Sequence, residues 1–112
     1  MKKEIRIRCW IDVDGEKFFG PGRVELLQRV GKTGSIAKAA KSMGMSYKKA
    51  WKMVDDLNEK GRKPYVVRHK GGKKGGGAEL TDSAKKMLSA YGRLEKQLEG
   101  LMRRNAGILK LV

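Results

Sequence analysis

The chain has 112 residues, with 27 lysines and arginines against 12 aspartates and glutamates, so its formal net charge is +15. A chain of this length forms one domain with a modest core. Its single cysteine, Cys9, excludes an intrachain disulfide. No apolar run is long enough to cross a membrane or to serve as a signal peptide, so a cytoplasmic location is expected. The excess of positive charge predicts a polyanionic partner, with nucleic acid favoured over an anionic membrane.

The N-terminal region has the pattern of a β-hairpin. Apolar residues alternate with other residues from Ile5 to Val13, which predicts a half-buried strand over 5–13. Asp14-Gly15 is a strong hairpin-turn signal, and Lys17-Phe18-Phe19 is expected to begin a short return strand.

Three helices are expected after the Gly20-Pro21-Gly22 break. Residues 23–31 form the first, because their apolar side chains recur at three-residue steps. Ser35 is expected to cap a helix over 36–43 that Gly44 ends, and Ser46 to cap a helix from 47 to about 60. Two helices joined by so tight a turn predict a helix-turn-helix, whose second helix enters the major groove of DNA.

A glycine-rich hairpin is expected to follow the second helix of this motif. The β-branched content of residues 65–69 predicts a strand, residues 78–80 a second one, and residues 71–77 form a basic glycine-rich loop between them. A strand, a loop and a strand after a recognition helix make a wing. The predicted fold is therefore α+β and mostly helical: a winged helix-turn-helix with an N-terminal β-hairpin and a long C-terminal dimerisation helix.

Positive charge is concentrated in this region. Between residues 44 and 77 there are ten lysines and arginines and three acids. Helix N-terminal amides bind phosphate, and glycines let a loop follow a backbone closely. Tyr47 and Trp51 lie on the apolar stripe of their helix, which favours core packing over base stacking for Trp51, whereas for Tyr47, at the helix start, both interpretations stay open. The residues expected to contact duplex DNA are Ser35, Ser46, Tyr47, Lys48, Lys49, Lys52, Arg68, Lys70, Lys73 and Lys74.

The last predicted helix, capped by Thr81 and running to about Arg104, has a heptad pattern. Its apolar residues recur at alternating steps of four and three, which is typical of a two-helix seam. We expect a homodimer contact, with packing of the helix on its own domain as the alternative. Residues 1–81 would then bind DNA, and residues 82–112 would form the dimerisation helix and a tail of undetermined form. The expected interface residues are Met87, Tyr91, Leu94, Leu98 and Leu101.

Several blocks of the sequence resemble the N-terminal DNA-binding domain of the ModE family, the molybdate-responsive transcription regulators of bacteria. The similarity extends over roughly residues 5–104, and its blocks are Gly34-Ser35-Ile36, Ala39-Ala40, Met45-Ser46-Tyr47-Lys48-Lys49-Ala50-Trp51 and the stretch from Gly71 to Thr81. The resemblance implies a winged-helix homodimer whose recognition helix starts near Ser46. Full-length family members also carry C-terminal molybdate-binding domains. These 112 residues end soon after the dimerisation helix, so the chain is expected not to sense molybdate alone, and a sensor-bearing partner chain is left open.

Catalysis is not expected. Gly31-Lys32-Thr33 resembles the end of a phosphate-binding loop, but Leu26 stands where that loop requires its first glycine. Asp12-x-Asp14 lacks the glycine and the closing glutamate of a calcium loop. The single histidine, His69, is distant in sequence from Cys9, so no metal site, cofactor or nucleophile is predicted.

The alternative function is that of a non-specific architectural nucleic-acid-binding protein, because charge alone drives unspecific binding. Single-strand RNA binding is disfavoured, since the exposed aromatic platforms of such proteins are missing from the pattern. A membrane-surface protein would place its basic residues on a long amphipathic helix with bulky apolar anchors, whereas the basic cluster here lies elsewhere.

Overall fold

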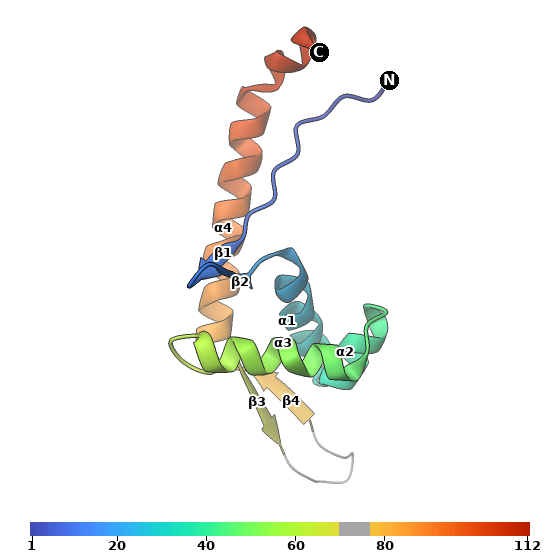
Figure 1. The fold of residues 1–112 in the computed structure, drawn as a ribbon, viewed down its shortest axis with the longest axis vertical. Coiled ribbons are helices and arrows are strands. Elements are labelled where there is room, and N and C mark those ends of the chain that lie inside the picture. Colours follow the sequence, from blue (N-terminus) through green and yellow to red (C-terminus); the bar gives the residue numbers. More distant parts are fainter. Residues whose placement is uncertain (70–76) are drawn as a thin grey trace.

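The computed structural model describes residues 1–69 and 77–112, and it confirms the predicted α+β winged helix-turn-helix fold (Figure 1). Helices dominate, and two antiparallel two-stranded sheets lie at separate places in the molecule. In chain order the elements are β1 (Ile11–Val13), β2 (Glu16–Phe19), α1 (Pro21–Thr33), α2 (Ile36–Ser42), α3 (Tyr47–Lys60), β3 (Val66–His69), β4 (Gly77–Leu80), α4 (Asp82–Arg104) and the 3-10 helix η1 (Ala106–Leu111).

The N-terminal hairpin is present but shorter than predicted. Asp14 and Gly15 both have positive φ, of 51° and 80°, as a two-residue turn of the Asp-Gly type requires. The predicted strand over 5–13 is wrong for its first half, because only 11–13 pair with β2. Residues 1–10 run beside the outer part of α4 (Figure 1), where they have no neighbouring strand. The Tyr91 hydroxyl donates a hydrogen bond of 2.6 Å to the Cys9 carbonyl oxygen and ties this segment to the helix.

Serine and threonine caps define the helix starts as predicted. The hydroxyl oxygens of Ser35, Ser46 and Thr81 accept hydrogen bonds from backbone amides at the starts of α2, α3 and α4. Helix α1 is longer at both ends than the predicted 23–31. It continues through Gly31 and ends at Thr33. Gly34 follows in the left-handed conformation, at φ 70°, and its N–H donates a hydrogen bond to the Val30 carbonyl oxygen.

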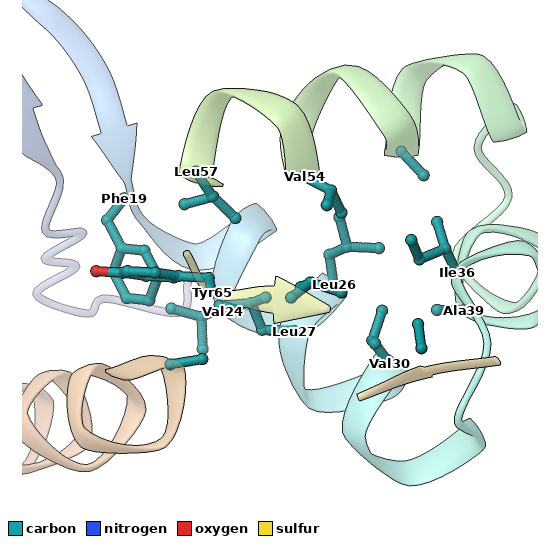
Figure 2. Packing of buried hydrophobic residues seen from close by; sticks show 14 of the residues in the cluster. Phe19, Val24, Leu26, Leu27, Val30, Ile36, Ala39, Val54, Leu57 and Tyr65 are labelled. Atoms are coloured by element: carbon teal, nitrogen blue, oxygen red, sulfur yellow. The ribbon is translucent and has the colours of Figure 1, made fainter. Parts of the chain in front are cut away.

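One apolar core joins β2, the three short helices, the wing and α4 (Figure 2). Ala39, Ala40 and Ala50 are buried where α2 and α3 pack together, and their small side chains allow the two helices to approach closely. Burying one large apolar side chain stabilises the fold by about 1.5–3 kcal/mol. The largest fully buried side chains are Phe19, Leu26, Leu27, Val30, Val54 and Leu57.

The wing strands β3 and β4 pair in an antiparallel register that runs from Val66 opposite Leu80 to His69 opposite Gly77. The Ala78 amide donates to the Gly34 carbonyl, which fixes β4 against the end of α1. The wing is thereby held in a defined place beside the helix-turn-helix (Figure 1).

Helix α4 has two parts with different surroundings. Its first part belongs to the core: Ala84 and Tyr91 are buried, and the Tyr91 ring packs edge-on against Phe19 at 5.3 Å between centroids. Its second part extends away from the body, and the chain ends beyond it in η1, which gives the tail its form (Figure 1).

Candidate nucleic-acid interface

The exposed side of α3 presents lysines in its first two turns. Lys48, Lys49 and Lys52 are all exposed, while Ala50 and Val54 of the same helix are buried. The helix is therefore fixed by its apolar side, and its cationic side stays in solvent. This is the placement that a recognition helix needs to meet a polyanion.

The charges of α3 run against its helix dipole. A helix N-terminus carries partial positive charge and favours acids, but the first turn of α3 contains Lys48 and Lys49 and no acid. The acids Asp55, Asp56 and Glu59 lie in the second half, and the last turn carries both Glu59 and Lys60. The two first-turn lysines are therefore unfavourable for the isolated helix. Phosphates bound at the first turn would offset that cost.

The acidic half of α3 is engaged in structural ion pairs. Asp56 contacts Arg23 of α1 and lies 3.1 Å from the Lys60 ammonium, which is also 3.2 Å from Glu16 of β2. The hydrogen bond from Arg23 is the main cause of the lowered pKa of Asp56, and the hydrogen bond to Asp56 is the main cause of the raised pKa of Lys60. These ion pairs attach the C-terminal half of α3 to the N-terminal hairpin and to α1. The N-terminal half carries the exposed lysines instead.

Two aromatic residues and one arginine link α3 to the wing. The guanidinium carbon of Arg68 in β3 lies 4.2 Å from the ring centroid of Trp51. One of its nitrogens is 3.4 Å from the Tyr47 hydroxyl, and the two aromatic rings meet edge-on at 6.1 Å. The core alternative for Tyr47 is wrong, because 46% of this residue is exposed, and Trp51 is only half-buried. No sequence pattern predicts this contact, because it depends on how β3 lies beside α3.

The two serines predicted to contact DNA already serve as caps. The hydroxyl oxygen of Ser35 accepts from the Lys38 amide, and that of Ser46 accepts from the Lys49 amide. Each hydroxyl keeps its own O–H for donation. Ser46 is exposed and Ser35 is half-buried, so Ser46 lies nearer to the expected groove surface.

The wing contributes exposed residues on β3 and β4. His69 lies 3.4 Å from Glu79 across the strand pair, and both are exposed. Three predicted contacts, Lys70, Lys73 and Lys74, lie outside the described residues.

The residues predicted for a dimer seam do not share one environment. Tyr91 is buried in the chain's own core, so the structure does not leave it available to a second copy. Met87 and Leu98 are half-buried, and Leu98 lines a hollow between α4 and residues 7–9. Leu94 and Leu101 are 37% and 46% exposed. The heptad pattern therefore has an inner part that packs within the domain and an outer part in solvent.

Other kinds of site are not found in the part of the chain that the structure describes. Among residues 1–69 and 77–112, no three His, Cys, Asp or Glu residues gather into a metal site. Within the same ranges, no helix is both long enough and apolar enough to cross a membrane.

The fold and this cationic surface define a winged helix-turn-helix protein of the DNA-binding kind. The family model for bacterial regulatory helix-turn-helix proteins of the lysR family matches residues 22–85, more than half of the chain. The chain belongs to this family of bacterial helix-turn-helix regulators. Within it, the resemblance to the N-terminal domain of the ModE family is confirmed by the relatives.

Three relatives illustrate the similarity. The molybdenum-pterin-binding protein MopB of Rhodobacter capsulatus is 43% identical over 93 residues, which cover 83% of this chain and 31% of MopB. The molybdenum transport protein ModE of Azotobacter vinelandii is 36% identical over 87% of this chain and 36% of its own length. The DNA-binding transcriptional dual regulator ModE of Escherichia coli K12 is 39% identical over 79% of this chain and 34% of its own. The chain thus spans about a third of the length of these relatives.

Proposed function

We propose that this chain recognises a particular duplex DNA sequence and does so as a homodimer, as the DNA-binding part of a transcription regulator. The observation that carries the proposal is the exposed trio Lys48, Lys49 and Lys52 on the first two turns of a helix held by its helix-turn-helix partner. Lysines kept against the helix dipole are costly for the fold alone and are useful to a protein that binds phosphates. A cytoplasmic location is part of the proposal, because a bacterial regulator works on the chromosome.

Salt dependence is the first test of duplex binding. If about six phosphates are neutralised, the affinity falls on the order of a thousandfold between about 50 and 200 mM salt. An affinity that barely changes over this range would contradict the proposal.

Helix and wing are proposed to divide the contacts. Lys48 and Lys49 lie at the end of α3 that enters the groove, so they are placed for bases, whereas Lys73 and Lys74 belong to the glycine-rich loop and are suited to phosphates. Lys49→Ala should change the sequence preference at a cost of about 1–3 kcal/mol. The double variant Lys73→Ala with Lys74→Ala should weaken all duplexes equally and reduce the salt slope. A change of sequence preference in the wing variant but not in Lys49→Ala would instead assign the base contacts to the wing and the phosphate contacts to α3.

Dimerisation is proposed to use the outer part of α4. Leu94 and Leu101 are exposed and seven residues apart, so they lie on one side of the helix two turns from each other. A second copy of the helix would cover both leucines. A two-fold dimer binds two half-sites, and this property distinguishes a regulator from an architectural protein, which would coat DNA without a discrete site.

Molybdate is the ligand that the family resemblance and the names of the relatives suggest. We propose that these 112 residues by themselves bind molybdate no better than sulfate. The hollow between α4 and residues 7–9 is lined by three glutamates, Glu25, Glu95 and Glu99, against one cation, Arg8, so its net charge disfavours anions. An open hollow near the start of α4 carries Arg62, Lys63 and Lys86 and attracts any dianion. Selective sensing would then require a further domain or a partner chain.

A further inference from the structure

The contact between Arg68 and the two aromatic residues joins the two elements that are proposed to touch DNA. Arg68 belongs to the wing strand β3, and Tyr47 and Trp51 belong to the first two turns of α3. Figure 1 shows the β3–β4 hairpin projecting beside α3, so this contact lies at the junction of helix and wing. The three side chains are contiguous: the Arg68 guanidinium stacks over the Trp51 ring at 4.2 Å, and the Tyr47 and Trp51 rings meet edge-on at 6.1 Å.

Arg68 differs from the exposed lysines of α3 because its guanidinium lies over an aromatic ring, 4.2 Å from the Trp51 centroid. Among the described residues, its one hydrogen-bond partner is the Tyr47 hydroxyl. An arginine can lie flat on an indole because its guanidinium is planar and weakly hydrated, whereas a lysine ammonium is compact and strongly hydrated. The stack therefore depends on the shape of the guanidinium and on more than its charge.

Tyr47 is the residue that this stack holds in place. It is the first residue of α3, directly after the Ser46 cap, and 46% of it is exposed. The N-terminal residues of a recognition helix contact base edges. A tyrosine hydroxyl can both donate to and accept from a base edge, whereas a lysine ammonium only donates.

We propose that Tyr47 determines sequence specificity and that Arg68, held on Trp51, is the positioning residue that fixes the Tyr47 side chain at the groove. The inference rests on the proposed function, since it requires α3 to enter DNA. The alternative is that Arg68 contacts a DNA phosphate. In that case only its positive charge would affect binding, and Arg68→Lys would behave like the parent.

The test compares three variants on two duplexes. One duplex is the sequence that the unmodified chain selects from a random pool, and the other is its scrambled form. Arg68→Lys retains the charge, Arg68→Ala removes it, and Tyr47→Phe removes only the hydroxyl. The preference for the selected duplex should fall by about 5- to 150-fold in all three variants, which is the range of discrimination at one base pair. The salt slope should stay unchanged in Arg68→Lys and Tyr47→Phe, because their charges are those of the parent.

A second measurement reports the stack directly. The chain has two tryptophans, so in a Trp10→Phe background the fluorescence comes from Trp51 alone. Its emission should shift in Arg68→Lys as well as in Arg68→Ala, while the melting temperature of Arg68→Lys stays that of the parent.

The possible results separate the claims. Arg68→Lys with unchanged preference and unchanged Trp51 emission, together with an equal loss on both duplexes in Arg68→Ala, would overturn the positioning role. A Tyr47→Phe variant with full preference would overturn the specificity role even if both arginine variants failed to fold. An unmodified chain that selects no sequence would instead contradict the proposed function on which the inference depends.

Discussion

Lys48→Glu should stabilise the folded protein and at the same time damage DNA binding. Lys48 lies in the first turn of α3, where a positive charge opposes the helix dipole and a negative charge complements it. The substitution also places a carboxylate four residues before Lys52, which is the favourable orientation of an i,i+4 pair. The two properties move in opposite directions only if this residue is retained for binding.

The size of the stability gain follows from these two effects. A charge near a helix end contributes about 0.3–1 kcal/mol, so reversing its sign yields about 0.6–2 kcal/mol. The new pair adds about 0.2–0.5 kcal/mol. At about 4 °C per kcal/mol for a domain of this size, the melting temperature should rise by about 3–10 °C. Thermal unfolding followed by circular dichroism at low salt measures this change.

Binding titrations over a salt series measure the other half of the prediction. The affinity for duplex DNA should fall, because the substitution removes a proposed base contact and places a carboxylate close to the DNA polyanion. Lys96→Glu is the matched control, since it makes the same change in net charge at an exposed position in the middle of α4. It corrects for the general relief of charge repulsion. Unchanged binding by Lys48→Glu, or a loss of stability relative to Lys96→Glu, would refute the reasoning.

Three further predictions concern the dimer, the ion pairs and the anion. Leu94→Glu with Leu101→Glu should convert the dimer into a folded monomer by light scattering, whereas Lys96→Glu should leave it a dimer; an unmodified chain that is monomeric at micromolar concentration would contradict the interface. Asp56→Asn should lower the melting temperature at pH 7 more than Asp55→Asn, because only Asp56 contacts Arg23. The pKa of Asp56 is lowered by folding, so its contribution is complete above about pH 5. The stabilising contribution of Asp56 is lost as the pH falls through its lowered pKa, so the difference in melting temperature between Asp56→Asn and Asp55→Asn should shrink on acidification. A difference that grew on acidification would contradict this prediction. Calorimetry should find no saturable molybdate binding beyond that of sulfate, and a micromolar molybdate-selective site would disprove this.

Local signals predicted the elements whose ends are set by their own residues. Ser35, Ser46 and Thr81 cap helices as expected, and Asp14-Gly15 forms the expected turn. These features depend on hydrogen bonds within a few residues, so the sequence around them is sufficient. The helix-turn-helix and the wing could then be predicted from the order of these helices and strands along the chain.

Features that depend on distant neighbours could not be predicted in this way. The alternation over 5–13 indicated a strand, but only a partner strand converts such a segment into a sheet, and residues 1–10 lie along α4 instead. The heptad pattern of α4 is the same for a residue that packs inside the domain, such as Tyr91, and for one that stays outside, such as Leu94. The stack of Arg68 on Trp51 requires two elements to be placed side by side. Each of these outcomes is decided by tertiary packing.

Selection of bound fragments from a random pool of duplexes, followed by footprinting of the best one, tests the central claim most directly. The claim is that α3 and the wing of a two-fold dimer recognise a defined DNA sequence. The predicted result is enrichment of one sequence with two inverted half-sites about one helical turn apart, and a single discrete protected region. A pool that stays random, with protection spreading evenly along the DNA as the protein concentration rises, would contradict the claim.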